Sequence, residues 1–232
     1  MLVDAGGTVK YLARALAELG FSFADLDAIL LSHEHTDHLG VAVPLSRLHS
    51  IPLWVTLEMA ECVPTLREAR LRLIPVGEYF SVGDLDIHAF RTPHDSLAAV
   101  GFSFYKGKQK IAVATDMGVV TDEIMAALSL ADVCVIEANH DLGMLRTSRY
   151  PLRLKNRIAG PLGHLSNIDA ATAISRLATG REQTFVLAHL SGDCNTPEMA
   201  LATVTAALAR VSAGGIRLIH APRMRMGSTC GA

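Results

Sequence analysis

The sequence is poor in cysteine, and its few cysteines are not paired along the chain. There is no C-x-x-C motif, and the four residues are widely scattered: Cys62, Cys134, Cys194 and Cys230. Such spacing predicts neither a disulfide framework nor a thiolate zinc site. Cys134 lies in an apolar run that resembles a strand, so we expect it to be an ordinary core residue.

Long hydrophobic runs are also absent. None of the apolar stretches reaches the length of about 20 residues that a helix needs to span a bilayer. Residues 1–7 lack the charged, apolar and cleavage regions of a signal peptide. We therefore expect a cytoplasmic protein that has no membrane partner.

The chain has no large excess of either charge and contains few aromatic residues. Its formal net charge is −2, and aromatic residues make up 5% of the sequence. A polyanionic substrate would have to be held by a local basic patch or by metal ions, because the field of the whole molecule does not attract it. With so few aromatic side chains, base stacking is not expected to be the main grip on a nucleic acid.

What the sequence does contain is an alternation of strand-like and helix-like segments over 232 residues, without repeats or linkers. We predict a single domain over residues 1–232, with a flexible tail at 223–232. Mixed strands and helices indicate an α/β protein in which two packed sheets are covered by helices. The expected elements include helices at 8–19, 38–48, 57–70, 122–128, 169–178 and 197–211, and strands at 84–90, 100–105, 111–114, 133–137, 184–188 and 216–219.

The segment Ser32–His38 holds four potential metal ligands within six residues and follows an apolar, strand-like run. Residues two apart in an extended loop point the same way, so His33 and His35 can bind one ion together. Asp37 and His38 come after the backbone has turned and can reach a second ion. Imidazole and carboxylate ligands suit zinc, manganese or iron. The alternative is a solvated polar loop, an improbable coincidence because the chain has only 10 histidines.

Further candidate ligands come directly after predicted strands. Each has an ordinary alternative, because a lone histidine at a strand end is more often a surface residue and a lone aspartate more often a helix cap. Asp116, which precedes a predicted helix, could be such a cap. Five such residues together indicate one site at which several strand ends meet. They are Asp4, His94, Asp116, Glu137 and His189.

The motif His33-x-His35-x-Asp37-His38 resembles the signature of the metallo-β-lactamase superfamily, whose members are metal-dependent hydrolases with an αββα sandwich fold. Further motifs make the chain similar to the YycJ/WalJ group of exonuclease-like phosphodiesterases, which are related to ribonuclease Z. These motifs are Asp4-Ala-Gly-Gly, Thr115-Asp116-Met-Gly, Glu137-Ala-Asn-His-Asp141, Gly163-His164-Leu-Ser-Asn167 and Ala188-His189-Leu-Ser191. Relatives carry a hairpin ahead of the first of these motifs. We expect this chain to lack that N-terminal hairpin, either because its true start lies upstream or because the protein has no such strands.

The resemblance implies two divalent metal ions, with zinc or manganese as the first expectation and iron as a further one. Seven residues of this sequence match the metal ligands of the family. The matching residues are His33, His35 and His94 for the first ion, Asp37, His38 and His189 for the second, and Asp116 as a bridge between both.

The resemblance also implies roles for residues around the ions. Asp4 matches a carboxylate that orients the ligands without binding the metal. Glu137 and His164 match a pair that lies beside the scissile phosphate in ribonuclease Z relatives, where the histidine can protonate the leaving oxygen. Together with Asp37 they are the expected catalytic residues. The alternative for His164 is a loop residue bonded to the backbone.

The segment Arg146–Arg157 carries five basic residues and no acidic one. We expect Arg149 and Arg153 to bind the phosphates of a nucleic acid strand, whereas a solvated helix face is the alternative. The favoured hypothesis is a nuclease that degrades DNA from a 5′ end, with DNA favoured over RNA, by attack of a metal-bridging hydroxide on phosphorus. A hydrolase of a small lactone, thioester or phosphodiester and a non-catalytic binding module are the alternatives. A homodimer is compatible with this hypothesis.

Overall fold

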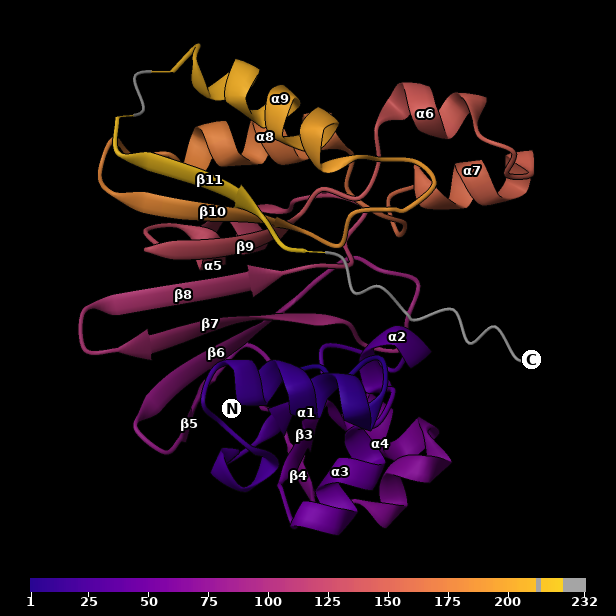
Figure 1. Ribbon diagram of the computed structural model, residues 1–232, viewed down its shortest axis with the longest axis vertical. Coiled ribbons are helices and arrows are strands. Elements are labelled where there is room, and N and C mark those ends of the chain that lie inside the picture. The colour runs from indigo at the N-terminus through magenta and orange to yellow at the C-terminus, as the bar shows by residue number, and fades with distance from the viewer. Residues whose placement is uncertain (212–213, 223–232) are drawn as a thin grey trace. The chain divides into compact units, whose positions relative to one another are not determined.

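The computed structural model describes residues 1–211 and 214–222, so the predicted flexible tail lies outside the described residues. Contacts between Cα atoms divide the described chain into two compact units. Unit 1 is Met1–Ile74, in indigo and purple in Figure 1, and unit 2 is Pro75–Pro222, in magenta to yellow. The assignment of a single domain stays a prediction.

Unit 1 is a four-stranded, fully parallel sheet with helices between its strands. The apolar run before the histidine-rich segment forms its second strand, buried at Ile29 and Leu31 against Leu45 and Met59 of the helices. The carboxyl ends of parallel strands lie at one edge, where the chain continues into the candidate ligands. The elements are β1 (Leu2–Val3), α1 (Val9–Glu18), β2 (Ile29–Leu30), α2 (Thr36–Leu39), α3 (Ala42–His49), β3 (Leu53–Val55), α4 (Leu57–Cys62) and β4 (Leu71–Leu73), with 3₁₀ turns at Phe23–Asp25 and Pro64–Glu68.

Two long helices predicted in unit 1 are broken, and each break has a steric cause. The helix predicted at 38–48 ends at Gly40, whose φ of 33° is not helical and whose added Cβ would lie 2.5 Å from the oxygen of Ala5. The helix predicted at 57–70 stops at Cys62 because Pro64 forces the preceding Val63 into extended backbone. The strands β3 and β4 were not predicted.

Unit 2 is a seven-stranded mixed sheet with the strand order β11-β10-β9-β8-β7-β6-β5. Strands β8 to β11 are mutually parallel, whereas β5 to β8 are joined as antiparallel neighbours. Figure 1 shows α8 and α9 over the β10–β11 end of the sheet and α6 and α7 beside them. The elements are β5 (Tyr79–Val82), β6 (Leu85–Arg91), β7 (Val100–Lys106), β8 (Gln109–Ala114), α5 (Asp122–Leu128), β9 (Val133–Glu137), α6 (Leu142–Thr147), α7 (Leu152–Ile158), α8 (Asn167–Leu177), β10 (Gln183–Ala188), α9 (Pro197–Leu208) and β11 (Ile216–His220).

The main helices of unit 2 begin at side-chain caps and are held by one apolar core. Hydroxyl groups of Thr121, Ser166 and Thr196 accept from backbone N–H groups in the first turns of α5, α8 and α9. Phe90 of the sheet and Ile174 of α8 are fully buried in the core cluster between these helices and the strands. The α/β prediction of two sheets flanked by helices is confirmed.

The burial of the cysteines makes a prediction about thiol chemistry. Cys62 is exposed, whereas Cys134 and Cys194 are buried, and burial raises the pKa of Cys134 to about 12. In a Cys230→Ser variant at pH 8, a thiol-reactive dye should label Cys62 rapidly and the two buried thiols only after denaturation. Peptide mapping by mass spectrometry checks the sites. Rapid native labelling of Cys134 would contradict the core placement, and a Cys62→Ser control should remove the fast phase.

Candidate metal centre

In unit 1, Asp4 organises the loop that follows β2. Its Oδ1 accepts from the backbone N–H of Ser32 (2.7 Å), and its Oδ2 accepts from the Ser32 hydroxyl and from Nδ1 of His38, both at 2.8 Å. An ionised carboxylate can only accept, so Nδ1 of His38 carries the proton. The lone pair of His38 is therefore on Nε2, which leaves that atom as the possible metal ligand.

His33 and His35 bring two ring nitrogens together in the same loop. Nε2 of His33 lies 3.0 Å from Nδ1 of His35, and His33 is fully buried. Two nitrogens bound to a tetrahedral zinc ion at about 2.0–2.1 Å would be about 3.3 Å apart, so this spacing is close to that of two ligands on one ion. Nδ1 of His33 lies 3.0 Å from the Ser32 hydroxyl, which again leaves Nε2 as the ligand atom.

The fourth member of the motif, Asp37, is more exposed than the three histidines, and its backbone carbonyl lies close to Gly6. Its side chain is 68% exposed, and its Oδ2 lies 3.7 Å from Nε2 of His38. A Cβ added to Gly6 would lie only 1.8 Å from the Asp37 carbonyl oxygen. The glycines after Asp4 therefore let two loops meet closely, and only glycine fits at position 6.

In unit 2, the candidate ligands lie at one edge of the seven-stranded sheet. Strand β6 runs in the same direction as β8, β9 and β10, because two antiparallel pairings separate it from β8. His94, Asp116, Glu137 and His189 come at or just after the carboxyl ends of these four strands. The strand directions thus bring together residues that are up to 95 positions apart in the sequence.

Glu137 is the centre of this group and is fully buried. Its Oε1 accepts from Nδ1 of both His164 and His189 at 2.8 Å, and its Oε2 accepts from the backbone N–H groups of Met117 (3.0 Å) and Leu165 (3.2 Å). Burial alone would raise the pKa of Glu137, but the hydrogen bonds and charges of the two histidines outweigh it and lower the pKa to about 2. Glu137 is therefore ionised, and Nε2 of each histidine keeps its lone pair or its exchangeable proton.

His94 and Asp116 complete the group. Nδ1 of His94 donates to the carbonyl oxygen of Gly163 (3.1 Å), and its Nε2 lies 3.8 Å from Oδ1 of the buried Asp116. Burial is the main cause that lowers the pKa of His94, which favours the neutral imidazole that metals bind. One donor atom from each of Asp116, Glu137, His164 and His189 lies within 4.8 Å of the others. Buried imidazoles and carboxylates with their outer atoms fixed are the donor set that a divalent metal requires.

Three of these residues have an unusual backbone. Asp4, Asp116 and His189 have φ angles of 58°, 56° and 56°, in the left-handed region that side chains other than glycine rarely adopt. Each comes directly after the strand that positions it or one residue later. Strained backbone is retained where the surrounding structure enforces it, most often at functional sites. The backbone thus supports a functional role for all three.

The structure settles some alternatives and adds residues that sequence reasoning missed. Asp116 is not the cap of α5, because Thr121 has that role. Sequence reasoning missed Ser32 as the partner of Asp4, and it missed the bond from His189 to Glu137. The pairing of β9 with β10, which places Glu137 opposite Ala188, is the signal for that bond, and it is not visible in one sequence.

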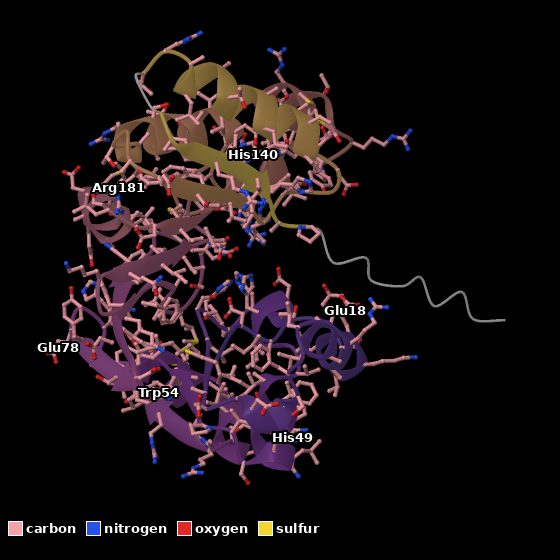
Figure 2. The ribbon with its side chains drawn as sticks, turned by 60° about the vertical axis from the view of Figure 1, so that its left-hand side comes forward. Glu18, His49, Trp54, Glu78, His140 and Arg181 are labelled. Carbon is pink, nitrogen blue, oxygen red and sulfur yellow. The ribbon has the colours of Figure 1, made fainter. Side chains whose placement is uncertain are left out.

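His140, in the loop that follows β9, is buried. It is 1% exposed, and neither ring nitrogen makes a hydrogen bond within the described residues. Figure 2 labels it in the upper part of unit 2. Burial lowers its pKa, so the ring is neutral.

The basic segment forms two short helices, α6 and α7, and only part of its charge faces solvent freely. Nζ of Lys155 donates to the carbonyl of Arg146 (2.7 Å), and Arg157 forms an ion pair with Asp95. Arg149 and Arg153 are exposed and make no hydrogen bond or ion pair with the residues that the structure describes. These contacts do not join the two arginines to His164 or Glu137.

Comparison with known proteins places this geometry in a family. The model of the "Beta-lactamase superfamily domain" matches residues 1–190. Exodeoxyribonuclease WalJ of Streptococcus pneumoniae is 37% identical over 92% of this chain and 82% of the relative, and exodeoxyribonuclease YycJ of Bacillus anthracis is 32% identical over 90% and 80%. The solved structure of Zn²⁺-bound PqqB from Methylobacterium extorquens has a TM-score of 0.68 at 17% identity, covering 95% of this chain and 81% of that chain.

The chain belongs to the metallo-β-lactamase superfamily and has its α/β fold. It is a metal-dependent hydrolase related to the WalJ and YycJ exodeoxyribonucleases. In the part of the chain that the structure describes, no helix is both long enough and apolar enough to cross a membrane.

The contacts of Asp4 predict a measurable effect on metal binding. In an Asp4→Asn variant the amide cannot accept from Ser32 and His38 as the carboxylate does, so His38 loses its fixed orientation. Metal affinity should fall by about 10–100-fold, as for other residues that orient ligands. Competition with a chelating dye measures the zinc affinity of the purified chain.

The matched control is Asp25→Asn, which changes an exposed carboxylate of the same unit that caps a 3₁₀ turn. This variant should bind zinc like the original chain. Unchanged affinity in Asp4→Asn would show that Asp4 does not orient a ligand.

Proposed function

We propose that the chain is a dinuclear metal-dependent phosphodiesterase that degrades DNA from a 5′ end. The observation that carries the proposal is the donor set. In unit 1 the half-buried Asp4 holds His38 by Nδ1, and in unit 2 the buried Glu137 holds His164 and His189 by Nδ1, so that Nε2 of each ring is left for a metal ion or a substrate. The relatives named as exodeoxyribonucleases, at 37% and 32% identity, support DNA as the substrate.

In this proposal the residues that match the metal ligands of the family bind a pair of ions. The chemistry of the donors suits zinc or manganese, and iron is also compatible. His33, His35 and His94 would hold the first ion, Asp37, His38 and His189 would hold the second, and Asp116 would be a ligand of both. A carboxylate suits the bridging position because its two oxygens can each bind one ion, whereas an imidazole has a single lone pair.

When bound, the two ions would act as Lewis acids and lower the pKa of a water molecule to near neutral, so that hydroxide would be available for attack on phosphorus. The residues of the chain hold the ligands in place for this chemistry. Asp4 and Ser32 fix the rings of the histidine-rich loop, and Glu137 fixes His189. Glu137 is already ionised and fully bonded, so it need not change its own protonation state.

We assign leaving-group protonation to His164. Its Nδ1 donates to Glu137 at 2.8 Å, and its side chain is 18% exposed, so its Nε2 can meet a substrate oxygen. Because Nδ1 is bonded to Glu137, Nε2 is the ring atom that can give a proton to the leaving oxygen as its bond to phosphorus breaks. The roles of Glu137 and His164 are thereby those of a positioning carboxylate and a general acid.

The helices α6 and α7 supply the grip on the DNA backbone. Arg149 is exposed in the bend between α6 and α7, and Arg153 is exposed on α7. Their guanidinium groups make no hydrogen bond or ion pair with the described residues. Guanidinium groups bind phosphate oxygens without reading sequence, as an exonuclease that degrades any sequence requires.

The first test is nuclease activity of the chain loaded with zinc or manganese. A single-stranded DNA labelled at its 3′ end should be shortened stepwise from the 5′ end, and a chelator should stop the reaction. His35→Ala removes a proposed ligand and should lower the rate at least about a hundredfold. The control is His49→Ala, which removes a histidine at the carboxyl end of α3 and should leave the rate unchanged.

The products also discriminate between the alternatives. Internal cuts, or faster cleavage of an RNA of the same sequence, would contradict the assignment as a 5′ exodeoxyribonuclease. Hydrolysis of bis(4-nitrophenyl) phosphate without any DNA cleavage would favour a small-molecule hydrolase instead.

The second test concerns the arginines. An Arg149→Ala, Arg153→Ala variant loses two proposed phosphate contacts, so the salt dependence of its affinity for single-stranded DNA should weaken by about 1.4 in slope, at about 0.7 per contact. Hydrolysis of bis(4-nitrophenyl) phosphate should not change, since that substrate does not reach the helices. The charge-matched control is Arg14→Ala, Arg67→Ala in unit 1. An equal salt slope in all three proteins would place the DNA elsewhere.

A further inference from the structure

Unit 2 contains a cavity of about 420 Å³ that none of the site residues above lines. Its walls come from the loop after Asp116, from the segment that follows α7, and from one side of α5 and α8. The residues that matter here are Val120, Met125, Pro161, Asp169, Thr172 and Arg176. We propose that this cavity is a nucleoside subsite, which takes the base and sugar of the terminal nucleotide of the DNA. The inference rests on the proposed function.

Residues that line the cavity are close in sequence to the proposed catalytic groups and contact the segments that carry them. Gly118, which lines it, is two residues from Asp116 and donates its N–H to the carbonyl of Pro93, next to His94. A Cβ on Gly118 would lie 2.3 Å from the backbone of Pro161, so the two loops that form the walls are in direct contact.

The opposite wall leads to the proposed general acid. His164 donates its backbone N–H to the carbonyl of Ile158 (2.8 Å), and Leu165, which lines the cavity, donates its own to Glu137. Two residues of the lining, Gly118 and Leu165, are therefore bonded through their backbone to Pro93, next to His94, and to Glu137.

The chemistry of the lining suits a nucleoside. Val120, Met125 and Pro161 offer apolar surface to the faces of a base. Asp169 can accept from amino or imino N–H groups of a base edge, because only its Oδ2 is engaged, by the Ser166 hydroxyl. Arg176 is exposed and makes no hydrogen bond or ion pair within the described residues, so it can donate to ring nitrogens or carbonyl oxygens.

The volume argues for one nucleoside and against a longer stretch of strand. Small-molecule sites have about 300–1,000 Å³, and this cavity lies at the low end of that range. A terminal nucleotide is also the one most easily unstacked into a pocket, because it has a neighbour on one side only. A site of this size would therefore favour strand ends over internal positions.

The basic residues, the cavity wall and His164 follow one another along the chain. Arg149 and Arg153 precede the cavity wall at Ala159 and Pro161, and His164 follows it. In this inference a DNA strand bound at Arg149 and Arg153 places its terminal nucleoside in the cavity and its first linkage near His164.

The experiment fills the cavity from its solvent side. Thr172 is exposed on α8 and lines the cavity, so Thr172→Trp adds bulk there without disturbing the core. The matched control is Thr205→Trp, on an exposed position of α9 outside the cavity. Three substrates are compared: bis(4-nitrophenyl) phosphate, thymidine 5′-(4-nitrophenyl phosphate), and single-stranded DNA with either a normal or an abasic terminal nucleotide.

We expect Thr172→Trp to raise KM for the thymidine ester and for normal DNA about tenfold, while Thr205→Trp leaves both unchanged. The original chain should prefer the normal end to the abasic end about tenfold, and Thr172→Trp should abolish that preference. Arg176→Ala, which removes a side chain, should weaken binding of the thymidine ester in the same direction. Neither substitution should alter hydrolysis of the base-free ester.

The base-free ester separates this inference from the proposed function. If the original chain hydrolyses no phosphodiester, the proposed function fails. If it hydrolyses the esters and DNA, but Thr172→Trp and Arg176→Ala keep the original KM and the preference for a normal end, the subsite is wrong. Equal losses on all substrates in both variants would also overturn it, because a nucleoside subsite affects only substrates that carry a nucleoside.

Discussion

The arrangement of unit 2 depends on one buried carboxylate. Glu137 has no exposed surface, yet it is ionised because four hydrogen-bond donors surround it. An ionised carboxylate without these partners would be costly in such a place, so the donors and the acid require each other. The four donors come from three separate segments of chain, after β8, before α8 and after β10. Satisfying one group therefore fixes the positions of Asp116, His164 and His189 together.

In unit 1 the carboxylate that fixes a histidine is Asp4, which is less deeply buried than Glu137 but bonds Nδ1 of His38 in the same way. In both units the acid takes Nδ1 and leaves Nε2, so the tautomer of each ring is decided by the protein before any ion binds. The left-handed backbone at Asp4, Asp116 and His189 belongs to this design. Each residue must turn its side chain out of a strand end within one or two positions, and ordinary extended backbone would point it along the strand instead. At Asp4 and His189 the strain is offset by the hydrogen bonds that the turned side chains form.

Sequence reasoning found the candidate ligands because their positions obey a simple rule. Polar residues that follow apolar runs stand out in one dimension, and parallel strands bring such positions to one edge, so Asp116 and His189 could be proposed without coordinates. The partners of these residues could not be proposed in the same way. Ser32 is an ordinary serine in sequence, and the bond between Glu137 and His189 depends on the register of β9 and β10. The predicted helix ends were wrong where backbone from a distant part of the sequence lies close by, as at Gly40, which packs against Ala5. Local pattern thus predicts which residue is special, while its partner depends on strand pairing over tens of positions.

The contacts of α7 suggest why the proposed DNA grip and the proposed chemistry share one stretch of chain. Arg157, at the end of this helix, forms an ion pair with Asp95, the neighbour of His94, and Ile158 accepts from the backbone of His164. The carbonyl of Gly163 in turn orients His94. A phosphate bound at Arg153 therefore acts on a helix whose far end contacts His164 directly and Asp95, the neighbour of His94. Binding energy from a remote part of the substrate raises a rate only when it reaches the reacting groups. In unit 2 only helix α7 lies between the proposed phosphate contact at Arg153 and the proposed reacting groups. Little of the binding energy need therefore be lost in flexible chain.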